Sequence, residues 1–224
     1  MLPLGIVILL SYIVGSIPTS IIITKLSRGI DIREHGSGNA GGTNVIRVLG
    51  LKAGLFVILL DMLKGYAAPM FVAKLMYGPT PFHNRTPFED YTVIQIIAGC
   101  AAILGHVWTM FSGFRGGKGI ATACGVLIGL APVEMVVSLS IFAIVFAASG
   151  YVSLGSISAS MAFPLAMLAR HNVFHADLDG YHTLIYFSIG IAVLLVYNHR
   201  ANIQRLKAGT EHKLTNLKFR KKTP

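Results

Sequence analysis

The chain has 224 residues, 54% of them hydrophobic and only 12% charged. Its mean hydropathy of +0.66 lies above the range of ordinary soluble domains and indicates a membrane protein. The formal net charge of +10 does not indicate a nucleic-acid partner, because Lys and Arg lie between apolar runs and not on one soluble face. We therefore expect a single membrane domain, residues 1–224, with a basic cytoplasmic tail from about 199 to 224.

An all-α fold with seven transmembrane helices is expected from the apolar runs. Four runs are long enough, or nearly so, to cross a hydrocarbon core of ~30 Å, namely residues 4–25, 53–77, 91–111 and 183–197. The apolar stretch from 120 to 170 is interrupted by Pro132, Gly150 and a run of small residues. These interruptions divide it into three shorter spans near 120–131, 133–150 and 154–169, whose limits the sequence leaves open.

The distribution of positive charge predicts the orientation of the chain. Fifteen of the nineteen Lys and Arg residues lie in the loops after the first and third spans and in the C-terminal tail. Positive loops stay in the cytoplasm, so the N-terminus is expected outside and the C-terminus inside. A chain of six spans would break this alternation.

The loop from 35 to 47 carries the first group of candidate ligands. Its glycines allow consecutive backbone N–H groups to converge on an anion, and an arginine supplies a planar charge suited to phosphate. The match to G-x-G-x-x-G that begins at Gly36 is weak, because a dinucleotide site needs a preceding strand. A flexible glycine hinge is the alternative, but it would not need so many polar side chains. The candidate phosphate ligands are Ser37, Gly38, Asn39, Thr43, Asn44 and Arg47.

A second glycine-rich segment, residues 105–122, places Lys118 at the start of a span. Its Gly-Gly-Lys-Gly run resembles a Walker A loop, but Ser112 stands where that motif has its first Gly, and Gly119 where it needs Ser or Thr. What remains is a lysine beside the free N–H groups of a helix N-terminus, which together favour an anion. His106 is expected to be an orienting or structural histidine.

The last apolar run leads into a third polar segment. If the helix continues, His199, Asn202 and Arg205 repeat every three residues and share one face. That face offers too few ligands for a metal, and neither a metal nor another cofactor is expected. The spacing indicates a functional role for His199 and Asn202, whereas membrane anchoring is the alternative for the basic residues. Glu211 is expected to pair with a nearby Lys or Arg.

Two serines form a smaller candidate group. Ser153 and Ser156 lie at the turn between the fifth and sixth spans, on the same side of the membrane as the three polar segments. Small residues in this turn also serve close helix packing, which is the alternative explanation for most of the run.

Together the three segments resemble the bacterial membrane family of acyl-phosphate:glycerol-3-phosphate acyltransferases. That family carries a G-S-G-N-x-G-x-T-N-x-x-R loop, a G-G-K-G-x-A-T segment and an H-x-x-N-I-x-R-L-x-x-G-x-E-x-K tail. All three are present, at 36–47, 116–122 and 199–213. Their order and the number of spans cover almost the entire chain, which makes the match specific.

The resemblance implies transfer of a fatty acyl group from acyl phosphate to the 1-hydroxyl of glycerol 3-phosphate, giving lysophosphatidic acid and phosphate. This reaction is the first acylation of phospholipid synthesis. The implied location is the bacterial plasma (inner) membrane, with the active site facing the cytoplasm. The implied partners are glycerol 3-phosphate, fatty acyl phosphate, membrane lipid and the enzyme that makes acyl phosphate.

The resemblance also implies roles for individual residues. Ser37, Arg47 and Lys118 would bind substrate phosphates, joined by Ser153 or Ser156. His199 and Asn202 would position the substrate and, with Ser37, form the catalytic group. The residues expected to shape the acyl-phosphate site are Gly116, Gly117, Gly119 and Thr122, and those expected to support the local fold are Glu211 and Arg205.

The proton acceptor is left open by the sequence. An acyl phosphate is already activated, so no nucleophilic Ser or Cys is required. The hydroxyl proton can pass to His199, whose unperturbed pKa is near ~6.5, or to the donor phosphate itself. The second route is favoured, because the sequence shows no acid that would orient His199. No histidine is followed five positions later by Asp, the pair that acyl-CoA- or acyl-carrier-protein-dependent glycerophosphate acyltransferases carry.

A transporter of a phosphorylated or anionic solute is the alternative function, because glycine-rich loops and helix N-termini also bind solutes in passage. Such a protein should have polar residues near mid-membrane in several spans. Asp61 and Lys64 are the strong candidates, and as neighbours on one helix face they are expected to satisfy each other. A scaffold that only recruits partners would leave the polar loops unexplained.

Overall fold

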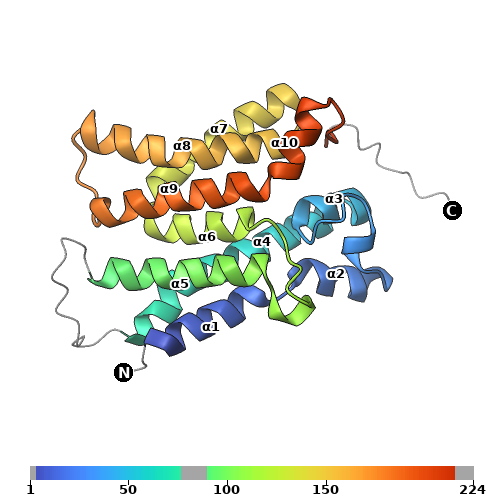
Figure 1. The fold of residues 1–224 in the computed structure, drawn as a ribbon, viewed down its shortest axis with the longest axis horizontal. Helices are drawn as coiled ribbons and strands as arrows, with labels where there is room; N and C mark the ends of the chain where they lie inside the picture. Colours follow the sequence, from blue (N-terminus) through green and yellow to red (C-terminus); the bar gives the residue numbers. More distant parts are fainter. Residues whose placement is uncertain (1–3, 77–89, 215–224) are drawn as a thin grey trace.

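The computed structural model describes residues 4–76 and 90–214, and the regular elements within them are all helical (Figure 1). The α-helices are α1 Leu4–Ser16, α2 Thr19–Arg28, α3 Gly42–Leu49, α4 Leu51–Ala67, α5 Asp90–Val107, α6 Ile120–Leu130, α7 Pro132–Ser149, α8 Val152–Asn172, α9 Tyr181–Asn198 and α10 Arg200–Lys207. Shorter helical turns are η1 Ile32–Glu34, η2 Ala68–Val72, η3 Ala73–Met76 and η4 Met110–Ser112. The all-α prediction is confirmed for these residues.

Six helical stretches of the described chain are long and apolar enough to cross a membrane. They are Leu4–Arg28, Leu51–Leu75, Tyr91–Ser112, Pro132–Ser149, Val152–Asn172 and Tyr181–Asn198. Seven full spans are not confirmed, because α6 has only 11 residues. At about 1.5 Å per residue it reaches roughly halfway across a ~30 Å core. α6 lies between two groups of longer helices, with α1, α4 and α5 on one side and α7, α8 and α9 on the other (Figure 1).

The first predicted span is broken into α1 and α2 at Ile17 and Pro18. Proline lacks a backbone N–H, so it interrupts the helical hydrogen bonds at this point. The Lys64 ammonium of α4 donates to the carbonyl of Ile17 (2.8 Å). Lys64 also pairs with Asp61 (2.8 Å), which accepts a hydrogen bond from Thr19 Oγ1 (2.6 Å). The expected Asp61–Lys64 pair is therefore confirmed, and it satisfies the break in the helix.

Two pairs of helices, α1 with α5 and α4 with α6, approach so closely that only glycine fits at the contact. In each pair a glycine of either helix lies against the backbone of the other, so that an added Cβ would meet a carbonyl oxygen at 1.9–2.3 Å. Such contacts are typical of helices packed within a bilayer, where small residues allow close van der Waals contact. The contacts are Gly15 with Ala102, Gly105 with Tyr12, Gly65 with Thr122, and Gly125 with Met62.

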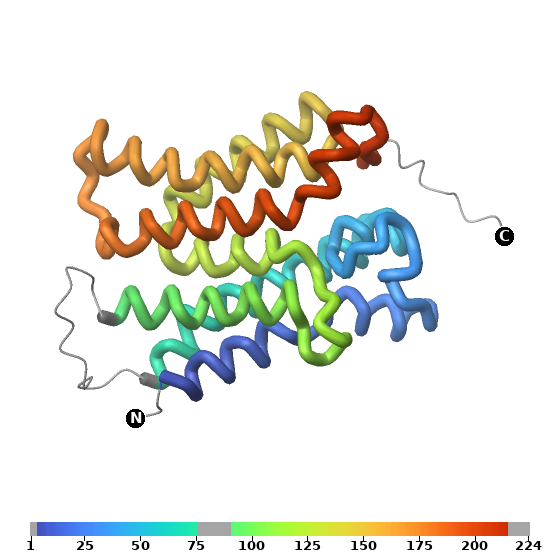
Figure 2. Tube along the Cα trace, in the orientation of Figure 1, coloured from blue at the N-terminus to red at the C-terminus, as the bar shows by residue number. Residues whose placement is uncertain are grey.

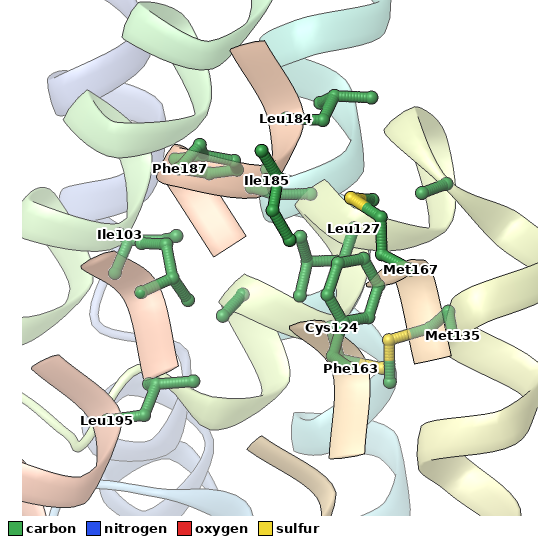
Figure 3. Close-up of a cluster of buried hydrophobic side chains, with 14 of the residues drawn as sticks. Ile103, Cys124, Leu127, Met135, Phe163, Met167, Leu184, Ile185, Phe187 and Leu195 are labelled. Carbon is green, nitrogen blue, oxygen red and sulfur yellow. The ribbon is translucent and has the colours of Figure 1, made fainter. Parts of the chain in front are cut away.

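The polar segments gather at one end of the molecule although they lie far apart in the sequence. Figure 2 shows the chain around α2 and α3, the connection between α5 and α6, and α10 side by side at this end. Further along the helices, a buried apolar cluster joins α5, α6, α7, α8 and α9 (Figure 3). The packing of the long helices thus places one polar region over one apolar core.

Substitution of Gly125 by Ala should destabilise the protein, because the new methyl would meet the Met62 carbonyl oxygen at 1.9 Å. Backbone atoms cannot move aside as a flexible side chain can, and overpacking of this kind costs about 1–3 kcal/mol. We expect a clear fall in the midpoint of thermal unfolding in detergent. Gly190→Ala is the control, since a Cβ there has nothing within 4 Å, and Ala favours a helix. Equal midpoints for the two variants would contradict this account of α4–α6 packing.

Candidate active site

A cavity of about 580 Å³ begins among the polar segments and continues between the helices. Its volume is typical of sites for small molecules. Its polar end includes Ser37, Thr43, Arg47, Lys118, Ser153, Ser156, His199, Asn202, Arg205 and Glu211, and its apolar part includes Leu127, Met135, Leu139, Phe142, Phe163 and Ile191. A cavity with these two parts suits a ligand that has an anionic head and a hydrocarbon tail.

The predicted site residues are brought together by the fold, with three exceptions. Gly38, Asn39, Asn44 and Gly119 line the same cavity as the polar side chains named above. Gly116, Gly117 and Thr122 do not line it.

The first polar loop is held in shape by Asn44, whose side chain is almost fully buried. Its Nδ2 donates to the carbonyl oxygens of Ile32 (3.1 Å), His35 (2.9 Å) and Asn39 (3.1 Å). Its Oδ1 accepts from the Ser37 backbone N–H (2.8 Å). Asn44 was expected to donate to phosphate, but these contacts direct its amide into the loop. Its position therefore orders the loop that carries Ser37 to the cavity.

The turn before Lys118 is closed by the end of α5. The Gly116 N–H donates to the Val107 carbonyl (3.0 Å), and the Gly117 N–H donates to the His106 carbonyl (3.1 Å). A Cβ on Gly116 would lie 1.9 Å from the His106 carbonyl oxygen, so glycine is required by the close approach. These two glycines therefore position Lys118 through packing, and their N–H groups are occupied by α5 carbonyls.

Lys118 lies between the turn and α6, with its side chain directed toward α10. Its ammonium donates to Asn202 Oδ1, and its carbonyl accepts from the Asn198 amide (3.1 Å). Burial lowers the pKa of Lys118 to about 8; the charge of Arg205 acts in the same direction and that of Glu211 opposes it. Lys118 is therefore mostly protonated near neutral pH, and an anion bound nearby would stabilise its charge.

Glu211 connects the end of the third polar segment to α8 and α10 through hydrogen bonds. Its Oε1 accepts from Ser153 Oγ (3.0 Å) and from Asn202 Nδ2 (2.7 Å). Its Oε2 accepts from Arg205 Nε (2.7 Å). Burial acts to raise the pKa of Glu211, but the hydrogen bonds from Asn202, Arg205 and Ser153 lower it below its ordinary value. The predicted pairing of Glu211 with a basic residue is confirmed for Arg205.

His199 caps the end of α9 and is buried. Its Nδ1 lies 2.7 Å from the Leu195 carbonyl oxygen, so Nδ1 carries the proton and Nε2 is left as an acceptor. Burial and the charge of Lys118 lower the pKa of His199 to about 4. His199 is therefore oriented by the backbone carbonyl of Leu195. No sequence motif indicates this contact.

Arg47 projects from α3 toward the C-terminal segment. Its Nη2 lies 3.5 Å from the His212 carbonyl oxygen, at the outer limit of a hydrogen bond. Its buried Nε has no hydrogen-bond partner within the described residues. Burial lowers the pKa of the Arg47 guanidinium from its ordinary value, although the charge of Glu211 opposes this. A buried donor of this kind is suited to an anionic ligand.

Some cavity residues were not predicted as part of the site. Asp61 and His106 reach it from α4 and α5, and His106 Nδ1 lies 3.5 Å from Asp61 Oδ1. The other polar side chains that line the cavity and were not predicted are those of Ser138, Ser160, Ser188 and His212. Ser160 continues the spacing of Ser153 and Ser156 along one helix face, a signal that was interpreted as helix packing. Among the described residues, no group of three or more His, Cys, Asp or Glu side chains is arranged to hold a metal ion.

A family model described as glycerol-3-phosphate acyltransferase matches residues 5–209. The chain belongs to the glycerol-3-phosphate acyltransferase family. A relative of that name from Chlorobaculum tepidum is 49% identical over 227 residues, which cover 93% of this chain and 95% of the relative. Another from Chlorobium phaeobacteroides is 45% identical over 96% of this chain and 97% of the relative.

Two crystal structures of PlsY, an integral membrane glycerol 3-phosphate acyltransferase, are similar to the structure of this chain. The glycerol 3-phosphate form has a TM-score of 0.78 and 35% sequence identity, and covers 94% of each chain. The lysophosphatidic acid form has a TM-score of 0.76 and 34% identity over 94% of each chain. The likeness thus extends over nearly the whole chain.

Anion binding at this site should weaken as the pH rises through about 8, where Lys118 loses its proton. Above about pH 7.5 inorganic phosphate is mostly dianionic, so in that range the loss of affinity reports the protein. We expect the affinity for phosphate, measured by calorimetry from about pH 7.5 to 9.5, to fall by up to tenfold per pH unit. In Lys118→Arg the side chain stays charged over this range, so the affinity for phosphate should no longer fall. A wild-type affinity that is constant over this range would contradict the role of Lys118 in anion binding.

Proposed function

We propose that the protein transfers a fatty acyl group from acyl phosphate to the 1-hydroxyl of glycerol 3-phosphate. The products are lysophosphatidic acid and inorganic phosphate, and the reaction is the first acylation of phospholipid biosynthesis. The observation that carries the proposal is the single cavity in which a cluster of cations and hydroxyl groups opens onto an apolar space. Family membership and the PlsY forms with glycerol 3-phosphate and lysophosphatidic acid support the acceptor and the product.

The two anionic heads are assigned to different parts of the polar end. The glycerol 3-phosphate phosphate binds Arg47, whose buried Nε lacks a protein partner in the described chain, and the adjacent loop at Ser37. The acyl-phosphate head binds Lys118 and the first N–H groups of α6, because a helix N-terminus favours an anion. Asn202 is held between Lys118 and Glu211, so it fixes the position of the Lys118 ammonium.

The reaction needs no covalent enzyme intermediate, because phosphate is already a good leaving group. The acceptor oxygen attacks the acyl carbonyl carbon, a C–O bond forms, and the bond from that carbon to the phosphate oxygen breaks. Negative charge that develops on the carbonyl oxygen is stabilised by Lys118 and the α6 N–H groups. The remaining contribution of the protein is to hold the two substrates in reacting positions.

The proton is proposed to leave with the phosphate. His199 Nε2 is free to accept a hydrogen bond from the acceptor hydroxyl, because Nδ1 is held by Leu195. A pKa of about 4 makes this imidazole a weak base near neutral pH, whereas the phosphate leaving group has a second pKa near ~6. His199 therefore orients the hydroxyl, and the donor phosphate takes its proton.

The site is proposed to face the cytoplasm of a bacterial plasma membrane. The basic segments lie at the end that carries α2, α3 and α10, and α1 begins at the opposite end (Figure 1). Positive segments stay in the cytoplasm, so this arrangement supports an outward start and an inward tail. Acyl phosphate made in the cytoplasm would enter from the same side, which supports contact with the enzyme that makes it.

Transport of an anionic solute is the weaker proposal. A transporter would need polar groups free to bind a solute in mid-membrane. The strongest candidates, Asp61 and Lys64, are bonded to each other and to Thr19 and the Ile17 carbonyl. These contacts hold both side chains at the break between α1 and α2.

The purified protein should form lysophosphatidic acid from palmitoyl phosphate and glycerol 3-phosphate without added metal. Radiolabelled glycerol 3-phosphate and separation of the lipid product provide the measurement. Palmitoyl-CoA in place of palmitoyl phosphate is the control donor and should give no product. Absence of product from palmitoyl phosphate and from shorter acyl phosphates, in protein with an intact thermal transition, would exclude the proposed reaction.

Arg47→Ala should raise the KM for glycerol 3-phosphate by about tenfold or more, the expected effect of losing a charge-assisted hydrogen bond. The KM for acyl phosphate should change by less than about threefold, because that substrate is assigned to Lys118. Arg28→Ala is the matched control, since Arg28 is exposed on α2 and does not line the cavity. An equal rise in both KM values would mean that the two phosphates are wrongly assigned.

A further inference from the structure

The apolar end of the cavity is closed by side chains from three helices. Leu127 of α6, Met135 of α7 and Phe163 of α8 line this end, and they are only 6%, 6% and 2% exposed. Figure 3 shows them gathered in one cluster, with Met167 and Cys124 packed beside them. This part of the cavity is therefore lined by side chains from the interior of the helix bundle.

The side chains along α8 indicate how far a hydrocarbon tail can reach. Beyond Ser153, which bonds to Glu211 at the polar end (3.0 Å), the cavity-lining residues of α8 are Ser156, Ala159 and Ser160, and then Phe163. Three small residues leave space along the helix, and the first large side chain obstructs it. Phe163 lies ten positions after Ser153, which is a depth of about 15 Å measured from Ser153, at about 1.5 Å per residue.

We propose that Phe163, together with Met135 and Leu127, limits the length of the acyl chain by contacting its terminal methyl group. The inference rests on the proposed function, because it requires an acyl donor whose head lies at Lys118. An extended chain advances about 1.3 Å per carbon, given C–C bonds of about 1.5 Å. A chain of about twelve carbons therefore reaches Phe163, and each further methylene must compress against the buried cluster, where close packing leaves little space.

Acyl phosphates with saturated chains of ten to eighteen carbons test this limit. Phe163→Ala removes a ring that reaches about 5 Å, so the preferred length should increase by about three or four carbons. The kcat/KM of the longer donors should rise by about fourfold for each methylene that gains a buried position. Ala159→Phe places a ring one helical turn nearer the polar end and should shorten the preferred length by a similar amount.

Leu165→Ala is the matched control, because Leu165 lies on the same helix but is 60% exposed and does not line the cavity. Its length profile should equal that of the wild type. If Phe163→Ala fails to fold, as judged by its thermal transition, Ala159→Phe still tests the limit from the other direction. The proposal would be overturned if Ala159→Phe lowered the activity toward all chain lengths equally. It would also be overturned if Phe163→Ala left the dependence of activity on chain length unchanged.

The outcome also separates this proposal from the function on which it depends. A wild type that forms no lysophosphatidic acid from any acyl phosphate would overturn both. A wild type that forms it, with the same length profile in all three variants, would overturn only the length limit and would mean that the chain leaves the cavity sideways into the bilayer.

Discussion

A buried carboxylate is stable only when its oxygens are hydrogen-bonded, and the polar end of this protein depends on one such group. Glu211 accepts hydrogen bonds from Ser153 of α8 and from Asn202 and Arg205 of α10. Asn202 in turn accepts from Lys118. One carboxylate thus joins the C-terminal segment, the start of α8 and the start of α6, and these segments carry many of the candidate ligands.

The same interactions leave the site with an excess of positive charge. Lys118, Arg47 and Arg205 surround Glu211, and burial together with the neighbouring arginines lowers the pKa of Lys118 to about 8. Like charges held at close range are stabilised when an anion binds between them. An anion bound among these cations would offset the cost of gathering them, so the charge of the site favours an anionic ligand.

The short helix α6 connects the polar end to the apolar cavity. It begins beside Lys118 and is buried between two groups of long helices, and its contact with α4 is close because Gly65 and Gly125 meet the opposing backbone. Since α6 holds both groups together, the cavity can extend beside it without opening into water. A reaction between a water-soluble phosphate and a lipid requires a site with both kinds of surface.

Sequence alone determined the helical membrane class, because a segment in lipid must satisfy its own backbone hydrogen bonds, and only long apolar helices do so here. The distribution of charge also predicted that Ser37, Arg47, Lys118 and His199 lie on one side of the membrane, and these four residues line one cavity in the structure. Only the tertiary structure decided that Asn44 bonds within its own loop, that Leu195 orients His199, that α6 is too short to span, and that Phe163 lines the same cavity as Lys118. Each of these depends on distances between segments that pack together, and no local pattern of residues contains those distances.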